Sequence, residues 1–251
     1  MEEYLGRHGA AATHIRKLFS SAGYRRENRE YVCEGTKLLE DAARSGVEIL
    51  RVVHTDEAPI PPVDRGKTYL CDGALMESLS SQKSPQGVIF TCRMGRQEQE
   101  IPTGFWLILD GVQDPGNVGT VLRSAEAFGA GCVILTPGCA DPYLYKTVRA
   151  SMGSVFRQRF AVMSREAILT LKRERNIPLY CADMGGESPV TALRGADCAV
   201  VVGSEGRGPS QTLLDAADGI ISIPMAGQCE SLNAAVAASV ILWEHMRNDG
   251  K

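Results

Sequence analysis

Five polar residues between positions 117 and 233 have side chains of types that could perform chemistry on a ligand. They are Asn117, Arg123, Glu205, Ser231 and Asn233. A guanidinium can bind a phosphodiester and stabilise negative charge as it develops, and amide, hydroxyl and carboxylate groups can orient a ligand through hydrogen bonds. If the fold brings the segments that carry them together, these side chains could line a ligand site.

These residues lie in or just after three loops, each of which follows a short apolar run. The loops read GVQDPGNVG from residue 111, GSEGRGP from residue 203 and PMAGQCESLN from residue 224. Parallel strands end at the same edge of their sheet, and open α/β folds bind ligands in the crevice at that edge. We therefore expect the three loops to converge on one site.

Arg123 is predicted to lie on a helix that starts at the first loop. The sequence DPGN at 114–117 predicts a type II turn, and Asn117 is predicted to cap a helix over 118–128. Helical side chains lean toward the N-terminus, so the guanidinium of Arg123 would reach toward the positive end of the helix dipole, a geometry that suits a phosphodiester. The alternative is a surface ion pair between Arg123 and Glu126.

The other two loops admit a functional and a structural interpretation. The three glycines of 203–209 would let backbone approach a ligand closely, although a tight turn would use them equally well. Glu205 lies among these glycines without an evident structural role, which favours a functional site. Ser231 is predicted to cap the final helix, with Asn233 in its first turn. Capping would explain both residues, but Asn233 lies one position beyond what a cap requires.

The apolar runs predict an α/β fold. After residue 105, six short apolar runs alternate with helical stretches, which is typical of a mainly parallel sheet covered on both faces. These runs are 106–110, 132–136, 159–163, 178–183, 197–203 and 219–224. The sequence predicts a small separate α/β domain over residues 1–92 and a polar linker over 93–104. It predicts that residues 105–251 form the domain that carries the three loops.

Composition and charge exclude several classes of protein. A net charge of −3 argues against non-specific coating of nucleic acid, so phosphate contacts must be local. The basic stretches 16–29 and 142–165 are the candidates, with solvated faces as the alternative. There is no apolar run of membrane length and no secretory signal, so we expect a cytoplasmic protein without a membrane partner. The eight cysteines occur singly, which predicts reduced thiols and no metal site.

No nucleotide-binding fingerprint occurs in the chain. The order G-x-x-G-x-G at 203–208 differs from the dinucleotide motif G-x-G-x-x-G, and G-x-x-x-x-G-K-[ST] is absent. A dehydrogenase on a doubly wound sheet is therefore disfavoured, as is an ATP-dependent enzyme.

The three loops, in this order and spacing, resemble the SpoU family of RNA ribose methyltransferases within the knotted SPOUT superfamily. The resemblance is carried by DGVQDPGNVGTVLR from residue 110, VVGSEGRG from residue 201 and IPMAGQCESLNAAVA from residue 223. It covers about residues 105–247. Three motifs in one chain are far more specific than any one loop.

The resemblance implies a C-terminal trefoil knot, a homodimer and S-adenosylmethionine as the methyl donor. The adenosine pocket would be lined by Thr136, Gly203, Ile223, Met225 and Leu232. The reaction centre would consist of Asn117, Arg123, Glu205, Ser231 and Asn233. The reaction would be methylation of a ribose 2′-hydroxyl in structured RNA.

The N-terminal half resembles the ribosomal-protein-like RNA-binding domain of ribosomal-RNA-modifying members. The resemblance rests on EGTKLLEDA from residue 34 and SQKSPQGV from residue 81. It favours 23S ribosomal RNA as the substrate. The alternatives are a tRNA 2′-O-ribose methyltransferase and a catalytically silent RNA-binding assembly factor.

The resemblance assigns Arg123 the role of general base, but a guanidinium has a pKa above about 12 and is not normally deprotonated in proteins. We interpret Arg123 instead as a clamp on the adjacent phosphate that stabilises the developing alkoxide. Asn117, Ser231 and Asn233 would orient the hydroxyl toward the methyl group.

Overall fold

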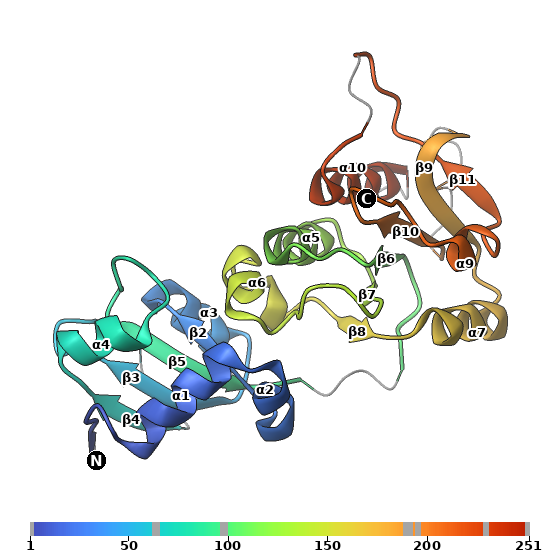
Figure 1. Cartoon of the computed structure of the whole chain (residues 1–251). Helices are drawn as coiled ribbons and strands as arrows, with labels where there is room; N and C mark the ends of the chain where they lie inside the picture. The colour runs from blue at the N-terminus through green and yellow to red at the C-terminus, as the bar shows by residue number, and fades with distance from the viewer. Residues whose placement is uncertain are drawn as a thin grey trace. The chain divides into compact units, whose positions relative to one another are not determined.

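The computed structural model describes residues 3–61, 66–95, 100–187, 193, 197–227 and 231–248 (Figure 1). The chain forms two compact units, which we describe separately. The first comprises Met1–Gly95 with Asp141–Phe156, and the second comprises Arg96–Ala140 with Arg157–Lys251.

The first unit is built on a five-stranded mixed sheet in the order β1-β4-β3-β5-β2, in which β5 runs antiparallel to both of its neighbours. Its strands are β1 (Glu3–Tyr4), β2 (Glu30–Glu34), β3 (Ile49–His54), β4 (Lys67–Leu70) and β5 (Val88–Arg93). Its helices include α1 (Ala10–Ser20), α2 (Ala22–Asn28), α3 (Thr36–Arg44) and α4 (Gly73–Leu79). The sequence shows β2, α3, β3 and β5 clearly. It does not show β4 and α4, because both are short and interrupted by polar residues.

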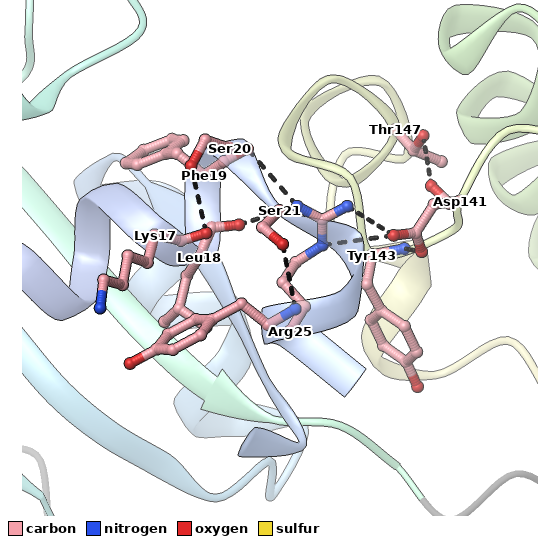
Figure 2. Close-up of polar contacts among 10 residues, drawn as sticks. Lys17, Leu18, Phe19, Ser20, Ser21, Arg25, Asp141, Tyr143 and Thr147 are labelled. Carbon is pink, nitrogen blue, oxygen red and sulfur yellow. Dashed lines mark hydrogen bonds and ion pairs between the residues drawn. The ribbon is translucent and has the colours of Figure 1, made fainter. Parts of the chain in front are cut away.

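Residues 141–156 pack with the first unit and contain α6 (Tyr145–Ala150) and the 3-10 turn η1 (Ser154–Phe156). Figure 2 shows the contact that holds them: Arg25, only 3% exposed, donates to one carboxylate oxygen of Asp141 from Nε (3.2 Å) and Nη2 (2.6 Å). Its Nη1 donates to the carbonyl of Leu18 at 2.8 Å. The predicted division of the chain places 141–156 with the second half. In the structure this segment lies on the first unit because its buried side chains and Asp141 have their partners there.

The second unit is a six-stranded sheet in the order β11-β9-β10-β6-β7-β8, and every pairing in it is parallel. The strands are β6 (Trp106–Asp110), β7 (Cys132–Leu135), β8 (Phe160–Val162), β9 (Leu179–Glu187), β10 (Ala199–Gly203) and β11 (Gly219–Ile221). Each falls within or overlaps a predicted run, and the prediction of a parallel six-stranded sheet is confirmed. The trefoil knot stays a prediction.

Helices cover both faces of this sheet. On one face, α5 (Pro115–Ala127) and α10 (Ala234–Asn248) pack over Leu107 and Leu109; on the other, α7 (Arg165–Arg175) and α9 (Gln211–Leu214) pack over Trp106 and Ile108. The alternation of side chains along β6 explains why its sequence is apolar throughout, since both faces are buried.

The region predicted as a linker, 93–104, lies partly outside the described residues, because 96–99 are not described. Arg93 ends β5, and Ile101 is 4% exposed and belongs to the core of the second unit. Seven cysteines are described, six of them buried, and none of these seven forms a disulfide. Among the helices that the structure describes, none combines the length and apolar character needed to span a membrane.

Candidate functional site

The predicted loops lie at the point where the chain changes direction across the second sheet. From β6 the chain continues to β7 on one side, whereas from β10 it continues to β11 on the other, and β6 and β10 are neighbours. Ligands of open α/β sheets bind beside the carboxyl ends of the two strands at such a switch point. The loops that carry Asn117 and Glu205 follow these two strands.

Three of the predicted reaction-centre residues form one hydrogen-bonded cluster. Asn117 donates from Nδ2 to Oε1 of Glu205 at 2.7 Å, and Asn233 donates from Nδ2 to the same oxygen at 2.8 Å. The Asn233 amide also lies 3.0 Å from Oδ1 of Asn117. These residues are separated by up to 116 positions in the sequence. The predicted convergence of the three loops is therefore observed for the Asn117–Glu205–Asn233 cluster.

The helix that carries Asn117 starts earlier than predicted. α5 begins at Pro115, and Asp114 is its cap because the Asp114 side chain accepts the backbone N–H of Asn117 at 2.8 Å. The predicted type II turn and the capping role of Asn117 are thus wrong. Proline at the first helical position and aspartate before it are favoured for this start. Because Asn117 does not cap the helix, its side-chain amide is available to donate to Glu205.

The final helix starts later than predicted, and its cap is Asn233 rather than Ser231. Oδ1 of Asn233 accepts the backbone N–H groups of Ala235 at 3.0 Å and Val236 at 3.3 Å. The same side chain therefore caps α10 with its oxygen and holds Glu205 with its nitrogen. The N–H of Ala234 also donates to Oε1 of Glu205 at 3.3 Å.

The carboxylate of Glu205 thus lies against the first turns of two helices, α5 and α10. The positive ends of both helix dipoles favour a negative charge there. Its partners are neutral amides and a backbone N–H, and Glu205 itself is exposed. All hydrogen bonds that it accepts from described residues go to Oε1, so Oε2 can still accept a hydrogen bond from a ligand.

Arg123 and Ser231 lie outside this hydrogen-bonded cluster. Arg123 is exposed on α5, six residues after Asn117, which places it about 9 Å along the helix axis and roughly 120° around it. The proposed alternative partner, Glu126, instead pairs with Arg157. Ser231 is exposed and precedes Asn233 by two residues.

The residues predicted to line the cofactor pocket follow the strands of the second unit or precede its last helix. Thr136 follows β7 and is 1% exposed, and Gly203 ends β10. Ile223 is half-buried after β11, Met225 is 37% exposed, and Leu232 is half-buried before α10. The parallel sheet accordingly places Thr136, Gly203 and Ile223 toward one edge.

A buried acid at this edge, Asp110, was not predicted. Its Oδ1 accepts hydrogen bonds from the hydroxyl of Thr136 at 2.8 Å and from Nε of Arg165 at 2.9 Å. Its Oδ2 accepts the backbone N–H of Ser210 at 2.7 Å. Burial alone would raise the pKa of Asp110, but hydrogen bonds from Ser210, Thr136 and Arg165 lower it below its ordinary value. A carboxylate at the end of the all-apolar run WLIL is the signal that could have identified it.

Comparison with known proteins assigns the family. Residues 104–243 match the SpoU rRNA Methylase family. The chain belongs to this family. Residues 13–89 match a second family, described as an MRM3-like substrate binding domain. The resemblance inferred from the three loops is confirmed.

Two of the matching proteins extend over nearly the whole chain, and a third matches a smaller part of it. The 23S rRNA (guanosine(2553)-2′-O)-methyltransferase RlmP of Bacillus subtilis is 30% identical, covering 89% of this chain and 90% of the relative. The structure of an S-adenosylmethionine-bound rRNA methyltransferase from Sinorhizobium meliloti is 27% identical, with a TM-score of 0.87, and covers 98% of this chain and 97% of that one. A structure concerned with 2′-hydroxyl methylation of C/U34 on tRNA is 27% identical, with a TM-score of 0.52, and covers only 59% of this chain but 97% of that one.

Proposed function

We propose that this protein transfers the methyl group of S-adenosylmethionine to a ribose 2′-hydroxyl of 23S ribosomal RNA. The observation that carries the proposal is the Asn117–Glu205–Asn233 cluster, which lies at the switch point of a SpoU-family sheet. RNA methylation is the activity of the family. The cluster supplies polar groups where such a fold binds ligands.

The residues after the strands fit an adenosine-bearing cofactor. Ile223 and Leu232 are half-buried and Met225 is exposed, so they offer apolar surface beside main-chain donors and acceptors at the strand ends. Such a combination suits an adenine ring. Thr136 would contribute its carbonyl oxygen, because its hydroxyl is already used by Asp110 and its N–H donates to the carbonyl of Leu109. When bound, S-adenosylmethionine supplies an activated methyl group on a sulfonium.

The chain's own residues must then align the ribose hydroxyl and ease the loss of its proton. The free Oε2 of Glu205 would accept the hydrogen bond of the hydroxyl, while the two amides keep this carboxylate in place. Arg123 would bind the adjacent phosphate and stabilise the developing alkoxide. Ser231, close in sequence to Asn233, would add a hydroxyl to the same reaction centre.

Ribosomal RNA is favoured over tRNA by the first unit. The relatives that act on ribosomal RNA match this chain over 89% and 98% of its length, whereas the tRNA-related structure covers 59% of it. The match of residues 13–89 to a substrate binding domain supports an RNA-binding role for the predicted domain 1–92.

Three exposed basic residues of the stretch 142–165, namely Lys146, Arg149 and Arg159, remain candidates for RNA phosphates. Arg157 and Arg165 do not, since each is paired with an acid, Glu126 and Asp110 respectively. The proposal thus keeps only part of the predicted basic stretch.

We further propose that the protein is a homodimer formed through α10. We also propose that its C-terminal region is knotted and that the protein acts in the cytoplasm. α10 exposes Val236 (48%) and Trp243 (46%), seven residues apart and therefore on one face of the helix. A second copy covering this face would remove apolar surface from water. Light scattering of the purified protein should give twice the mass of the chain, and W243E should shift it toward the monomer.

The reaction is tested with labelled S-adenosylmethionine and purified ribosomal RNA or tRNA. We expect label in ribosomal RNA, recovered in alkali-resistant dinucleotides because a methylated 2′-oxygen cannot attack the neighbouring phosphate. Label in tRNA alone would support the tRNA alternative. RNA binding without label would support the silent assembly factor and contradict the proposal.

A further inference from the structure

Asp110 lies between the two loops that build the proposed site, yet it has no assigned part in the reaction. It is the last residue of β6, and its side chain is 1% exposed. The loop that carries Asn117 begins at the next residue, Gly111, whose N–H donates to the Thr136 hydroxyl at 3.1 Å. That hydroxyl in turn donates to Asp110.

Asp110 contacts both ends of the loop that carries Glu205. Strand pairing places Asp110 opposite Gly203, where the loop starts, and its Oδ2 accepts the N–H of Ser210, where the loop ends. A carboxylate with hydrogen bonds to several segments restricts each of them, because every lost bond would leave a buried polar group unpaired.

The loop between these anchors is closed on itself. The N–H of Gly208 donates to the carbonyl of Ser204 at 2.8 Å. A Cβ atom on Gly203 would lie 1.9 Å from the carbonyl carbon of Gly208, so backbone packs directly on backbone at the base of the loop. Glu205 is carried at the tip of this closed loop. Its position therefore depends on where the base of the loop is held.

We propose that Asp110 is a positioning residue for methyl transfer. By anchoring both ends of the loop 203–210, it fixes the carboxylate of Glu205 against the amides of Asn117 and Asn233. Arg165 compensates the buried charge through Nε and through Nη2, which lies 2.6 Å from Oδ1. This inference rests on the proposed function, because it assigns Asp110 to the same site.

The test compares Asp110→Asn with Asp218→Asn. Asparagine has the shape of aspartate but replaces one acceptor oxygen with a donor, so D110N must lose at least one of the hydrogen bonds at Asp110. Asp218 is the control because it also accepts a backbone N–H, from Leu179 at 2.7 Å, and pairs with a cation, Lys172 at 2.9 Å, at a site where its side chain is 48% exposed. It lies at the opposite edge of the sheet, where β9 and β11 begin.

Two readouts are taken at a temperature at which circular dichroism shows both variants folded. Hydrogen–deuterium exchange of peptides covering 203–210 should be about tenfold faster in D110N, corresponding to about 1.4 kcal/mol of lost local protection, and unchanged in D218N. The kcat for RNA methylation should fall about tenfold or more in D110N and less than about twofold in D218N.

Wild-type exchange in 203–210 of D110N, or an equal loss of kcat in D218N, would overturn the assignment. If D110N does not fold, Arg165→Gln gives a second comparison, since it removes the cation beside Asp110 together with its contacts to Oδ1, and its side chain is 30% exposed. The exchange measurement needs no RNA. A wild-type protein that methylates no RNA would contradict the proposed function, whereas unchanged loop exchange would contradict the role of Asp110.

Discussion

Two glutamates, one in each unit, are held by hydrogen bonds from distant segments but in opposite electrostatic settings. Glu30 is 3% exposed, lies 3.0 Å from Nε2 of His14 and pairs with Arg51. Burial would raise the pKa of Glu30, but the neighbouring side chains of Thr91, His14 and Arg51 lower it. Glu205 is exposed and receives only neutral donors among the described residues, from Asn117, Asn233 and the backbone of α10.

The difference separates a carboxylate that stabilises a fold from one that can act on a ligand. Breaking the pair between a buried acid and a cation is strongly destabilising, because the remaining charge is left without a partner. An exposed acid fixed by amides and helix ends keeps its own charge uncompensated and accessible. We therefore expect substitutions of Glu30 to affect stability and substitutions around Glu205 to affect catalysis.

The largest effect should come from Arg123→Ala, since the Asn117–Glu205–Asn233 cluster contains no cation of its own. Turnover should fall about 10³-fold or more through loss of the phosphate clamp, while S-adenosylmethionine affinity stays within about threefold. Single-turnover methylation and calorimetry measure the two quantities. Arg175→Ala, an exposed arginine on α7 across the sheet, is the matched control. Near-normal turnover of R123A would contradict the clamp.

The second largest effect should come from Glu205→Gln. The amide keeps the shape of the side chain but removes the negative charge, so methylation should slow about 100-fold. The free energy of unfolding should change by less than about 1 kcal/mol, because Glu205 is exposed. If E205Q instead lost stability and kept its rate, the distinction between the two glutamates would fail.

Glu30→Gln should show the reverse of Glu205→Gln, with a loss of stability and no loss of cofactor affinity. Loss of the charge leaves Arg51 half-buried without its acid, and we expect the first unit to lose about 2–3 kcal/mol of stability. S-adenosylmethionine affinity should stay unchanged, since the expected cofactor residues belong to the second unit. Urea unfolding followed by circular dichroism, fitted with two transitions, gives the stability. An E30Q protein as stable as wild type would show that the buried pair contributes nothing net.

Acid should remove the same contribution from the wild-type protein. Because the folded pKa of Glu30 is lowered, its stabilisation is complete above the unfolded pKa, about 4.3, and is lost as pH falls through the folded pKa. The stability difference between wild type and E30Q should therefore shrink as the pH falls below about pH 4. A difference that grew below that pH would contradict the assigned sign.

The smallest effect concerns RNA affinity. Arg149→Gln should weaken RNA binding a few-fold and reduce its salt slope by about one, because Arg149 is exposed. Arg157→Gln should have less effect, since Arg157 is engaged by Glu126. Filter binding at several salt concentrations distinguishes the two. Equal effects would mean that the ion pair between Arg157 and Glu126 opens on RNA binding. If R149Q had no effect, Arg149 would not belong to the RNA-binding surface.

The sequence predicted the second sheet well because its central strands are buried on both faces and read as uninterrupted apolar runs. It also predicted that Asn117, Glu205 and Asn233 would meet, since all three follow strands of one parallel sheet. The helix starts were wrong because several neighbouring residues at each start are suitable caps. Asp114 caps α5 and Asn233 caps α10, and only the three-dimensional structure shows which oxygen accepts which N–H.

Contacts between distant segments could not be predicted from local pattern. Arg25 reads as part of a basic stretch that could contact phosphate or be solvated, but in the structure it is buried against Asp141, 116 positions away. Arg165 likewise reads as a candidate for RNA phosphate and instead neutralises Asp110. In both cases the partner is an acid whose position depends on the tertiary fold.

The central claim is that the site at the ends of β6 and β10, held around Glu205, methylates ribose in ribosomal RNA. It is tested most directly by mass-spectrometric mapping of 2′-O-methyl nucleotides in RNA from cells that carry the wild-type gene, no gene, or E205Q. The account predicts that one nucleotide of 23S ribosomal RNA loses its methyl group both without the gene and with E205Q. Ribosomal RNA that keeps every methyl group when the gene is absent would contradict it.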